Sequence, residues 1–175
     1  EAMQGRMGFY DSFSRRLNML KGVREEDILA TAKGLNLQKG AEEFVSYCQR
    51  HSIAVFLISG GLEPFAKYFA EQLGFDGYCA SAVSYDSSGF LHINDGDLVV
   101  TAEYKRQWMQ KICNDYGFRV NEVIAIGDGA NDQFMIESAG VGVGFSPKEV
   151  LTPYIDVFND LKDHSFMMSF LRQLF

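Results

Sequence analysis

The stretch VIAIGDGANDQFM, residues 123–135, begins as an apolar strand and then breaks into glycines, aspartates and an asparagine. Asp128 stands just past the predicted strand, between two glycines that let the backbone fold closely around it. Asn131 and Asp132 begin the predicted helix that follows. Mg²⁺ prefers oxygen ligands and is usually held by one or two carboxylates, so the cluster predicts a metal site at Asp128. The alternative, that Asn131 or Asp132 only caps the helix, explains one residue and not the cluster.

A second junction of strand and helix lies upstream. The run IAVFLI, residues 53–58, is apolar and rich in β-branched residues, which is typical of a strand buried on both faces. Ser59, Gly60 and Gly61 follow it and lead into a predicted helix over 62–73. Bare backbone N–H groups, a hydroxyl and a helix N-terminus together form a good phosphate cradle. A plain turn, in which serine caps and glycine supplies the tight geometry, is the alternative.

Strands and helices alternate along the chain. This alternation predicts an α/β fold, with a doubly wound, Rossmann-like parallel sheet and right-handed crossovers. Ligands of such sheets bind beyond the carboxyl ends of the strands, which is the edge that both junctions occupy. The predicted strands are 53–58, 123–126, 141–145 and 155–158, the arms of a β-hairpin are 78–83 and 90–93, and the helices are 1–20, 24–34, 40–51, 62–73, 102–117, 131–140 and 165–175.

Composition narrows the class of protein. A length of 175 residues fits one domain, or one domain with a small insert. The net charge of −7 argues against a nucleic-acid partner and against a membrane surface, because both attract a basic face. No apolar run is long enough to span a bilayer. Cys48, Cys79 and Cys113 are odd in number and widely spaced, which predicts buried thiols in a reducing compartment, the cytosol, and neither disulfides nor a zinc site.

Lys105 lies near the start of the predicted helix 102–117. Taken alone it is an ordinary surface lysine. Next to the Ser59–Gly61 junction it could be the point charge that neutralises phosphate oxygens.

These motifs, in this order, resemble those of a known family. ISGG (58–61), Lys105 and GDGAND (127–132) are similar to motifs two, three and four of the haloacid dehalogenase (HAD) superfamily, with the closest resemblance to its phosphoserine phosphatase family. The opening EAMQG…FYDSFSRRLNMLKG resembles the helical cap segment of that family, and the resemblance reaches to about Ala139. It implies a HAD-type sheet with a small helical cap, with residues 1–38 as the cap segment and 39–175 as the core.

The first motif of that family, a strand ending in Asp-x-Asp, is not found in these residues. The pair Asp95 and Asp97 lies in a predicted loop on the wrong side of the lysine. We expect the motif on a segment before Glu1, where it would supply the nucleophile and the central strand of the sheet. Without that strand, the strands that precede both junctions would have exposed edges. A naturally truncated, non-catalytic phosphate-binding module is the alternative.

The resemblance implies a Mg²⁺-dependent phosphomonoester hydrolase that works through an aspartyl-phosphate. Ser59 and Gly60 would bind phosphate oxygens and Lys105 would neutralise them. Asp128 would hold Mg²⁺, and Asp132 would orient Lys105 or a metal-bound water.

O-phosphoserine is the substrate implied, and another small phosphorylated metabolite is the alternative. Asn131 would form a hydrogen bond near the phosphate. Arg16 would face the substrate carboxylate, and Met3 and Phe9 would pack over the site. For Arg16 the alternative is a solvated helix face. The oligomeric state stays open.

Overall fold

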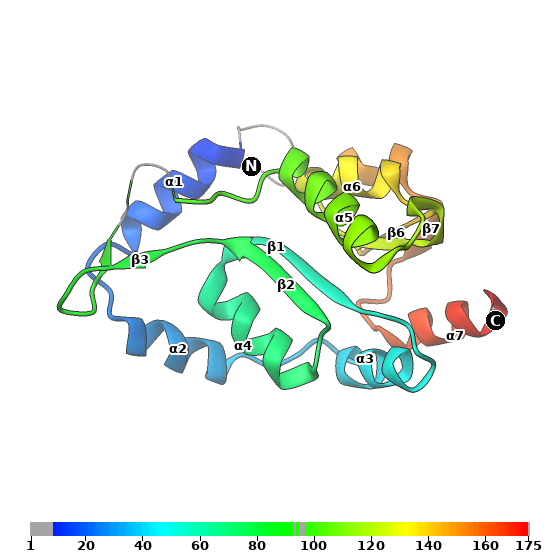
Figure 1. Ribbon diagram of the computed structural model, residues 1–175, viewed down its shortest axis with the longest axis horizontal. Coiled ribbons are helices and arrows are strands. Elements are labelled where there is room, and N and C mark those ends of the chain that lie inside the picture. Colours follow the sequence, from blue (N-terminus) through cyan, green and yellow to red (C-terminus); the bar gives the residue numbers. More distant parts are fainter. Residues whose placement is uncertain (1–8, 93, 95–96, 175) are drawn as a thin grey trace. The chain divides into compact units, whose positions relative to one another are not determined.

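The computed structural model describes residues 9–92, 94 and 97–174 (Figure 1). The chain divides into two compact units, each built from two stretches of sequence. The β1–β2 unit consists of Arg16–Val99 and Lys162–Phe175. The β5–β7 unit consists of the residues up to Arg15 and of Val100–Leu161.

In the β1–β2 unit, β1 (Phe56–Leu62) and β2 (Gly77–Ser81) pair in parallel, and α4 (Glu63–Leu73) connects them and packs on both. α2 (Glu25–Gly34) packs against α4. α3 (Ala41–Arg50) packs against the C-terminal helix α7 (Ser165–Leu174), whose Met167 and Leu171 are buried. The unit is therefore one parallel strand pair with helices from both stretches of its sequence.

The strand prediction was wrong for residues 78–83. They were expected to form one arm of a hairpin, whereas Gly77–Ser81 joins the parallel sheet as β2. Three consecutive buried residues, Cys79 to Ser81, explain the difference, because a hairpin arm with one face in water would alternate. The hairpin itself exists but is shorter: β3 (Ser84–Tyr85) pairs antiparallel with β4 (Leu91–His92).

The first predicted strand is also displaced. β1 begins at Phe56 and continues through the glycines to Leu62. Ser59 pairs with Ala80, and the next pairing joins Leu62 to Ser81. The two glycines between them have no opposite residue on β2 and form a bulge, a local widening that is common beside functional sites.

In the β5–β7 unit, β5 (Ile124–Gly127), β6 (Val141–Phe145) and β7 (Val157–Asn159) form a parallel sheet in that order. α6 packs on β5 and β6, and α5 packs on α6. The helical segments of this unit are α5 (Ala102–Tyr116), α6 (Gln133–Ser138) and the short 3-10 turns η2 (Val120–Glu122), η3 (Ala130–Asp132) and η4 (Glu149–Tyr154). The predicted α/β class with parallel strands is confirmed.

Among the residues that the structure describes, β1 pairs only with β2 and β5 only with β6. Each of these two strands thus keeps one edge without a strand partner there.

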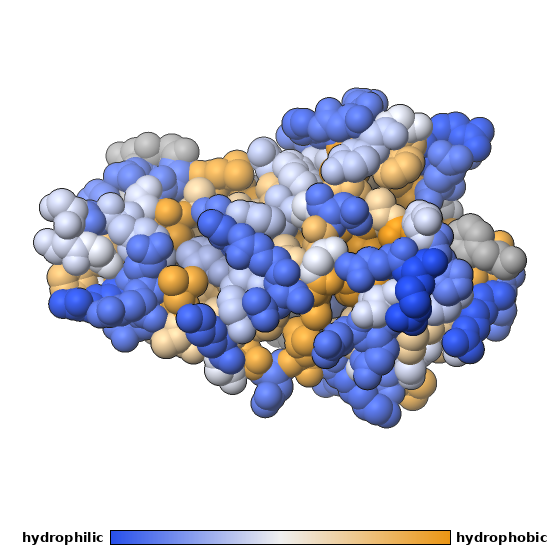
Figure 2. Space-filling model, turned by 60° about the horizontal axis from the view of Figure 1, so that its bottom comes forward, coloured by the Kyte–Doolittle hydropathy of each residue, from blue (hydrophilic) through white to orange (hydrophobic). Residues whose placement is uncertain are grey.

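α1 covers Phe9–Met19, and its Phe13 and Leu17 are buried. The three cysteines are buried, as predicted. No helix in the described ranges is long and apolar enough to cross a membrane. Hydrophilic residues cover most of the face shown in Figure 2, and hydrophobic ones form separate small patches.

Candidate active site

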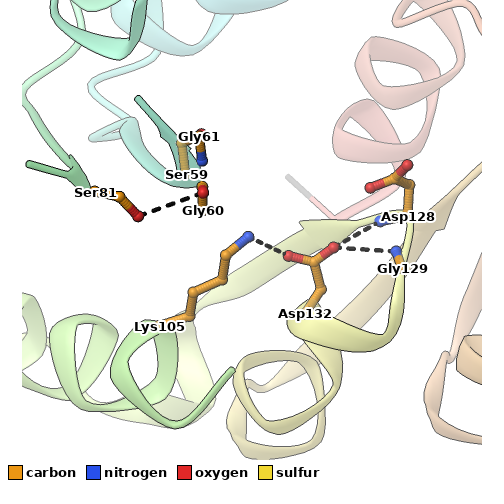
Figure 3. A network of polar contacts seen from close by, with 8 residues as sticks. All are labelled: Ser59, Gly60, Gly61, Ser81, Lys105, Asp128, Gly129 and Asp132. Carbon is orange, nitrogen blue, oxygen red and sulfur yellow. Dashed lines mark hydrogen bonds and ion pairs between the residues drawn. The ribbon is translucent and has the colours of Figure 1, made fainter. Parts of the chain in front are cut away.

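Asp132 organises the end of β5. Its Oδ2 accepts hydrogen bonds from the backbone N–H groups of Asp128 (3.0 Å) and Gly129 (3.1 Å), as Figure 3 shows. A Cβ on Gly127 would lie 2.4 Å from the Cβ of Asp132, so only glycine leaves room for this close approach. The expected capping of the following helix is not observed, because Asp132 is the N-cap residue of α6 but makes no side-chain hydrogen bond to it. Its Oδ2 instead accepts the Gly129 N–H at the start of η3, which occupies one of the two carboxylate oxygens.

The other oxygen binds Lys105. The Lys105 Nζ atom lies 2.6 Å from Asp132 Oδ1, and each side chain is only 6% exposed. Lys105 is therefore no surface lysine. Its place is set by α5, whose N-cap residue Thr101 accepts the N–H of Tyr104 at 3.2 Å. A buried charge is tolerated when it is paired and hydrogen-bonded, and Asp132 meets both conditions for the lysine.

Asp128 has a different environment. Its carboxylate is half-buried and points away from the Lys105–Asp132 pair in Figure 3. Burial, and next the negative charge of Asp132, raise the pKa of Asp128 above its ordinary 3.8, while the charges of Lys105 and Lys148 oppose the shift. A bound cation stabilises the charged form of a carboxylate that is partly buried beside a second carboxylate.

Asn131 contributes an unused acceptor. Its Oδ1 atom is buried and has no hydrogen-bond partner within the described part of the chain. Such an atom is costly unless a ligand or water meets it. It lies on η3, between the two aspartates of the cluster.

The described residues contain no group of three or more His, Cys, Asp or Glu side chains that could hold a metal by themselves. Mg²⁺ commonly keeps several waters and takes one or two carboxylates together with substrate phosphate. At the end of β5, Asp128 supplies one half-buried carboxylate, and the unpaired Asn131 oxygen is near it in sequence. These two groups fit that pattern of ligation.

The β1 bulge belongs to the other unit. The Ser59 hydroxyl accepts the N–H of Gly61 at 3.0 Å, which leaves its own hydrogen for a ligand oxygen. Gly60 is buried, and its carbonyl accepts a hydrogen bond of 3.3 Å from the Ser81 hydroxyl (Figure 3). The bulge is thus held by side chains on both of its strands.

The remaining candidates are placed as follows. Arg16 is exposed in the last turn of α1, in the β1–β2 unit. Phe9 is the first residue of α1. Met3 lies outside the described residues. The structure therefore brings Lys105, Asp128, Asn131 and Asp132 together in one unit, and Ser59, Gly60 and Arg16 belong to the other.

Sequence reasoning missed two residues. Lys148 donates its N–H to the carbonyl of Asp128 at 2.8 Å, and its charge lowers the pKa of that carboxyl. Its only trace in the sequence was its place in the triplet SPK at 146–148. Ser81 is completely buried beside the bulge. It was assigned to a hairpin arm, and only the pairing of β2 with β1 reveals its position.

The chain is similar to known proteins in sequence and in fold. The sequence model of the haloacid dehalogenase-like hydrolases matches residues 1–140. The phosphoserine phosphatase of Archaeoglobus fulgidus is 33% identical over 162 residues, which is 89% of this chain but 45% of that protein, so the chain spans less than half of this relative. A solved phospho-aspartyl intermediate analogue of phosphoserine phosphatase has a TM-score of 0.90 and 27% identity, over 97% of this chain and 81% of that chain. A substrate-bound phosphoserine phosphatase complex has a TM-score of 0.88 and 27% identity, over 97% and 80%.

Proposed function

Since the chain belongs to the haloacid dehalogenase-like hydrolases, in the phosphoserine phosphatase family, we propose that the complete protein hydrolyses a phosphomonoester, O-phosphoserine, to an alcohol and inorganic phosphate. The observation that carries this proposal is the buried Lys105–Asp132 pair next to the half-buried Asp128 at the end of β5. An ammonium fixed by one carboxylate, with a second carboxylate at the end of the same strand that can take a cation, is suited to the charge of a phosphoryl group.

Lys105 neutralises the phosphate. Its ammonium has three hydrogens, and the bond to Asp132 Oδ1 uses one of them. We assign the other two hydrogens to phosphate oxygens. Asp132 acts as a positioning residue, because its two oxygens hold the lysine and the Asp128–Gly129 backbone at once. Preorganised charge of this kind lowers the barrier to phosphoryl transfer, since no group needs to rearrange during the reaction.

Ser59 and Gly60 bind the phosphate oxygens. The Ser59 hydroxyl is fixed as an acceptor of the Gly61 N–H, so it donates its own hydrogen to the ligand. The bulge frees Gly60 from regular pairing with β2, which supports its use of backbone groups for an anion.

Asp128 would hold Mg²⁺, and Asn131 would accept a hydrogen bond from a water or a hydroxyl of the ligand. When bound, the ion would withdraw negative charge from the phosphate oxygens. The raised pKa of Asp128 and the orphaned Asn131 oxygen support these assignments, because both indicate groups that lack their partner in the protein alone.

We place the phosphoryl acceptor, an aspartate of an Asp-x-Asp motif, on a segment outside these 175 residues. Its carboxylate would attack phosphorus and form an aspartyl-phosphate as the alcohol leaves, and water would then release phosphate. The unpartnered edges of β1 and β5 among the described residues support a strand from that segment. On this proposal the 175-residue chain does not turn over by itself.

The substrate side of the site lies in the proposed cap, residues 1–38. Arg16 would bind the carboxylate of phosphoserine with its planar fork. Met3 and Phe9 would cover the bound substrate, and residues 39–175 would form the core. The three buried cysteines support the cytosol as the location.

A substrate panel tests the proposal. The complete protein is assayed for phosphate release from phosphoserine and from other small phosphomonoesters, with and without Mg²⁺. Lys105→Ala is expected to lower kcat/KM on every substrate by on the order of 10²-fold, because its charge acts in the transition state. Lys111→Ala, which removes a 64%-exposed lysine from the same helix, is the matched control. Equal activity of the two variants would contradict the proposal.

A further inference from the structure

We propose that the β3–β4 hairpin is a spacer between the Ser59–Gly60 bulge and the end of α1 that carries Arg16, and that it thereby sets the length of substrate accepted. Gly89, Phe90 and Leu91 are then positioning residues for specificity. The inference rests on the proposed function, because it takes the bulge as the phosphate site and Arg16 as the carboxylate site.

The base of the hairpin is fixed beside the bulge. The chain enters it directly from β2, whose last residue, Ser81, bonds to the Gly60 carbonyl. The N–H of Ala82 then donates to the carbonyl of Leu98 at 2.8 Å. The Ser84 hydroxyl donates to Asp97 Oδ1 at 3.1 Å. The departing and returning chains are therefore closed together within a few residues of the phosphate site.

The tip of the hairpin holds the connector between α1 and α2. The N–H of Leu91 donates to the Val23 carbonyl at 2.8 Å, and the Gly22 N–H donates to the Leu91 carbonyl at 3.3 Å. The N–H of Glu25 donates to the Gly89 carbonyl at 3.1 Å. Arg24 of the connector and Phe90 form an antiparallel bridge, so the connector lies along β4 almost as a third strand. In Figure 1, β3 lies at the same end as the start of α2.

Side chains reinforce this pairing. The guanidinium carbon of Arg24 lies 5.1 Å from the ring centroid of Phe90. That distance is within the range of a cation–π interaction. Leu91 is only 2% exposed. The tip is therefore attached to the connector by backbone and by side-chain contacts.

The connector in turn fixes Arg16. After α1, the Leu20 N–H donates to the Leu17 carbonyl and the Val23 N–H to the Leu20 carbonyl, each at 3.0 Å. These turns follow the helix without a gap, and Leu17 is buried. Arg16 lies in the last helical turn, so the held connector determines where its side chain starts.

The spacer is stiff. Asp86 Oδ1 accepts the N–H groups of Ser88 (2.8 Å) and Phe90 (3.1 Å). Gly89 has a φ of +79° and donates to the Asp86 carbonyl at 2.9 Å. A left-handed glycine in a turn closed by an aspartate keeps one conformation, so the hairpin transmits a fixed length.

A fixed length is chemically useful here. A phosphomonoester with a carboxylate has two anionic ends whose separation is set by its carbon chain. Reaction rates fall by about 10²-fold when a reacting group is misplaced by about 1 Å. Loosening the tip is expected to relax discrimination by length while phosphate chemistry continues.

The test uses Phe90→Ala and Gly89→Ala in the complete protein. Each variant is compared with wild type on O-phosphoserine, on its homologue with one more methylene, and on p-nitrophenyl phosphate, which has no carboxylate. We expect kcat/KM for phosphoserine to fall by about tenfold or more, the preference over the homologue to shrink, and the aryl phosphate to change by less than about threefold. Phe118→Ala, which removes a 41%-exposed ring far along the sequence, is the control.

Hydrogen exchange shows whether the tip was released. The amides of Gly22, Glu25 and Leu91 are expected to exchange faster in both hairpin variants, because these amides make the tip contacts. Faster exchange with unchanged length preference would overturn the spacer, and so would unchanged exchange in both variants. If the wild type does not hydrolyse phosphoserine, the proposed function fails and the spacer fails with it. If the wild type hydrolyses phosphoserine and both variants keep its preference over the longer homologue, the spacer proposal is refuted and the proposed function stands.

Discussion

The buried Lys105–Asp132 pair makes the sharpest prediction about stability. Asp132→Asn keeps the shape of the side chain but leaves one acceptor oxygen where there were two. The single oxygen can serve Lys105 or the backbone N–H groups of Asp128 and Gly129, but not both. In either case no negative charge remains beside Lys105, whose side chain is only 6% exposed.

Removing one partner of a buried ion pair costs about 3–5 kcal/mol, because the other charge stays buried and unpaired. We expect a loss in this range for Asp132→Asn in the free energy of unfolding. Lys105→Met removes the charge but leaves Asp132 its two N–H donors, so it is expected to cost less. The double variant has no unpaired charge and is expected to be more stable than Asp132→Asn alone.

Urea denaturation of the four proteins measures these values, with the midpoint and slope read separately. Contacting residues of this kind couple by about 0.5–3 kcal/mol in a double-mutant cycle. A coupling near zero, or a double variant less stable than both single ones, would refute the reasoning. Lys111→Met with Asp115→Asn, an exposed pair on the same helix, is the control and is expected to couple by about 0.5 kcal/mol or less.

Three further predictions concern other charged groups. Asp128→Asn is expected to abolish Mg²⁺-dependent turnover and the Mg²⁺-induced rise in melting temperature while the circular dichroism spectrum stays that of wild type; a retained Mg²⁺ effect would make Asp128 structural. Arg16→Ala is expected to cost about 2–4 kcal/mol in kcat/KM for phosphoserine and little for p-nitrophenyl phosphate, and equal losses would show that Arg16 supports the cap only. Lys39, mainly by its hydrogen bond, lowers the pKa of Asp163 from 3.8 to about 2, so the stability that this pair provides is present above pH about 4 and lost as the pH falls towards 2. The stability difference between wild type and Asp163→Asn is measured against pH, and a constant difference over that window would contradict the assignment.

Local pattern predicted the junction at Asp128 well, because a strand, two glycines and a helix follow one another within a few residues. It failed where the partner is distant in sequence. Ser81 and its neighbours look like a hairpin arm, since the turn at 86–89 is close by, whereas their actual partner is β1. The burial of Lys105 also depends on an aspartate 27 positions away, so the helix alone suggests a surface residue.

The division of the chain bears on its synthesis. The β1–β2 unit needs α7, whose Met167 and Leu171 are buried, but all of Val100–Leu161 is translated between Val99 and that helix. At about 5–20 residues per second, α3 waits on the order of several seconds for its partner helix after the rest of its unit has been made. During that interval the apolar side of α3 is open to chaperones and to other nascent chains. The second unit, although later in sequence, leaves the ribosome before the first can be completed.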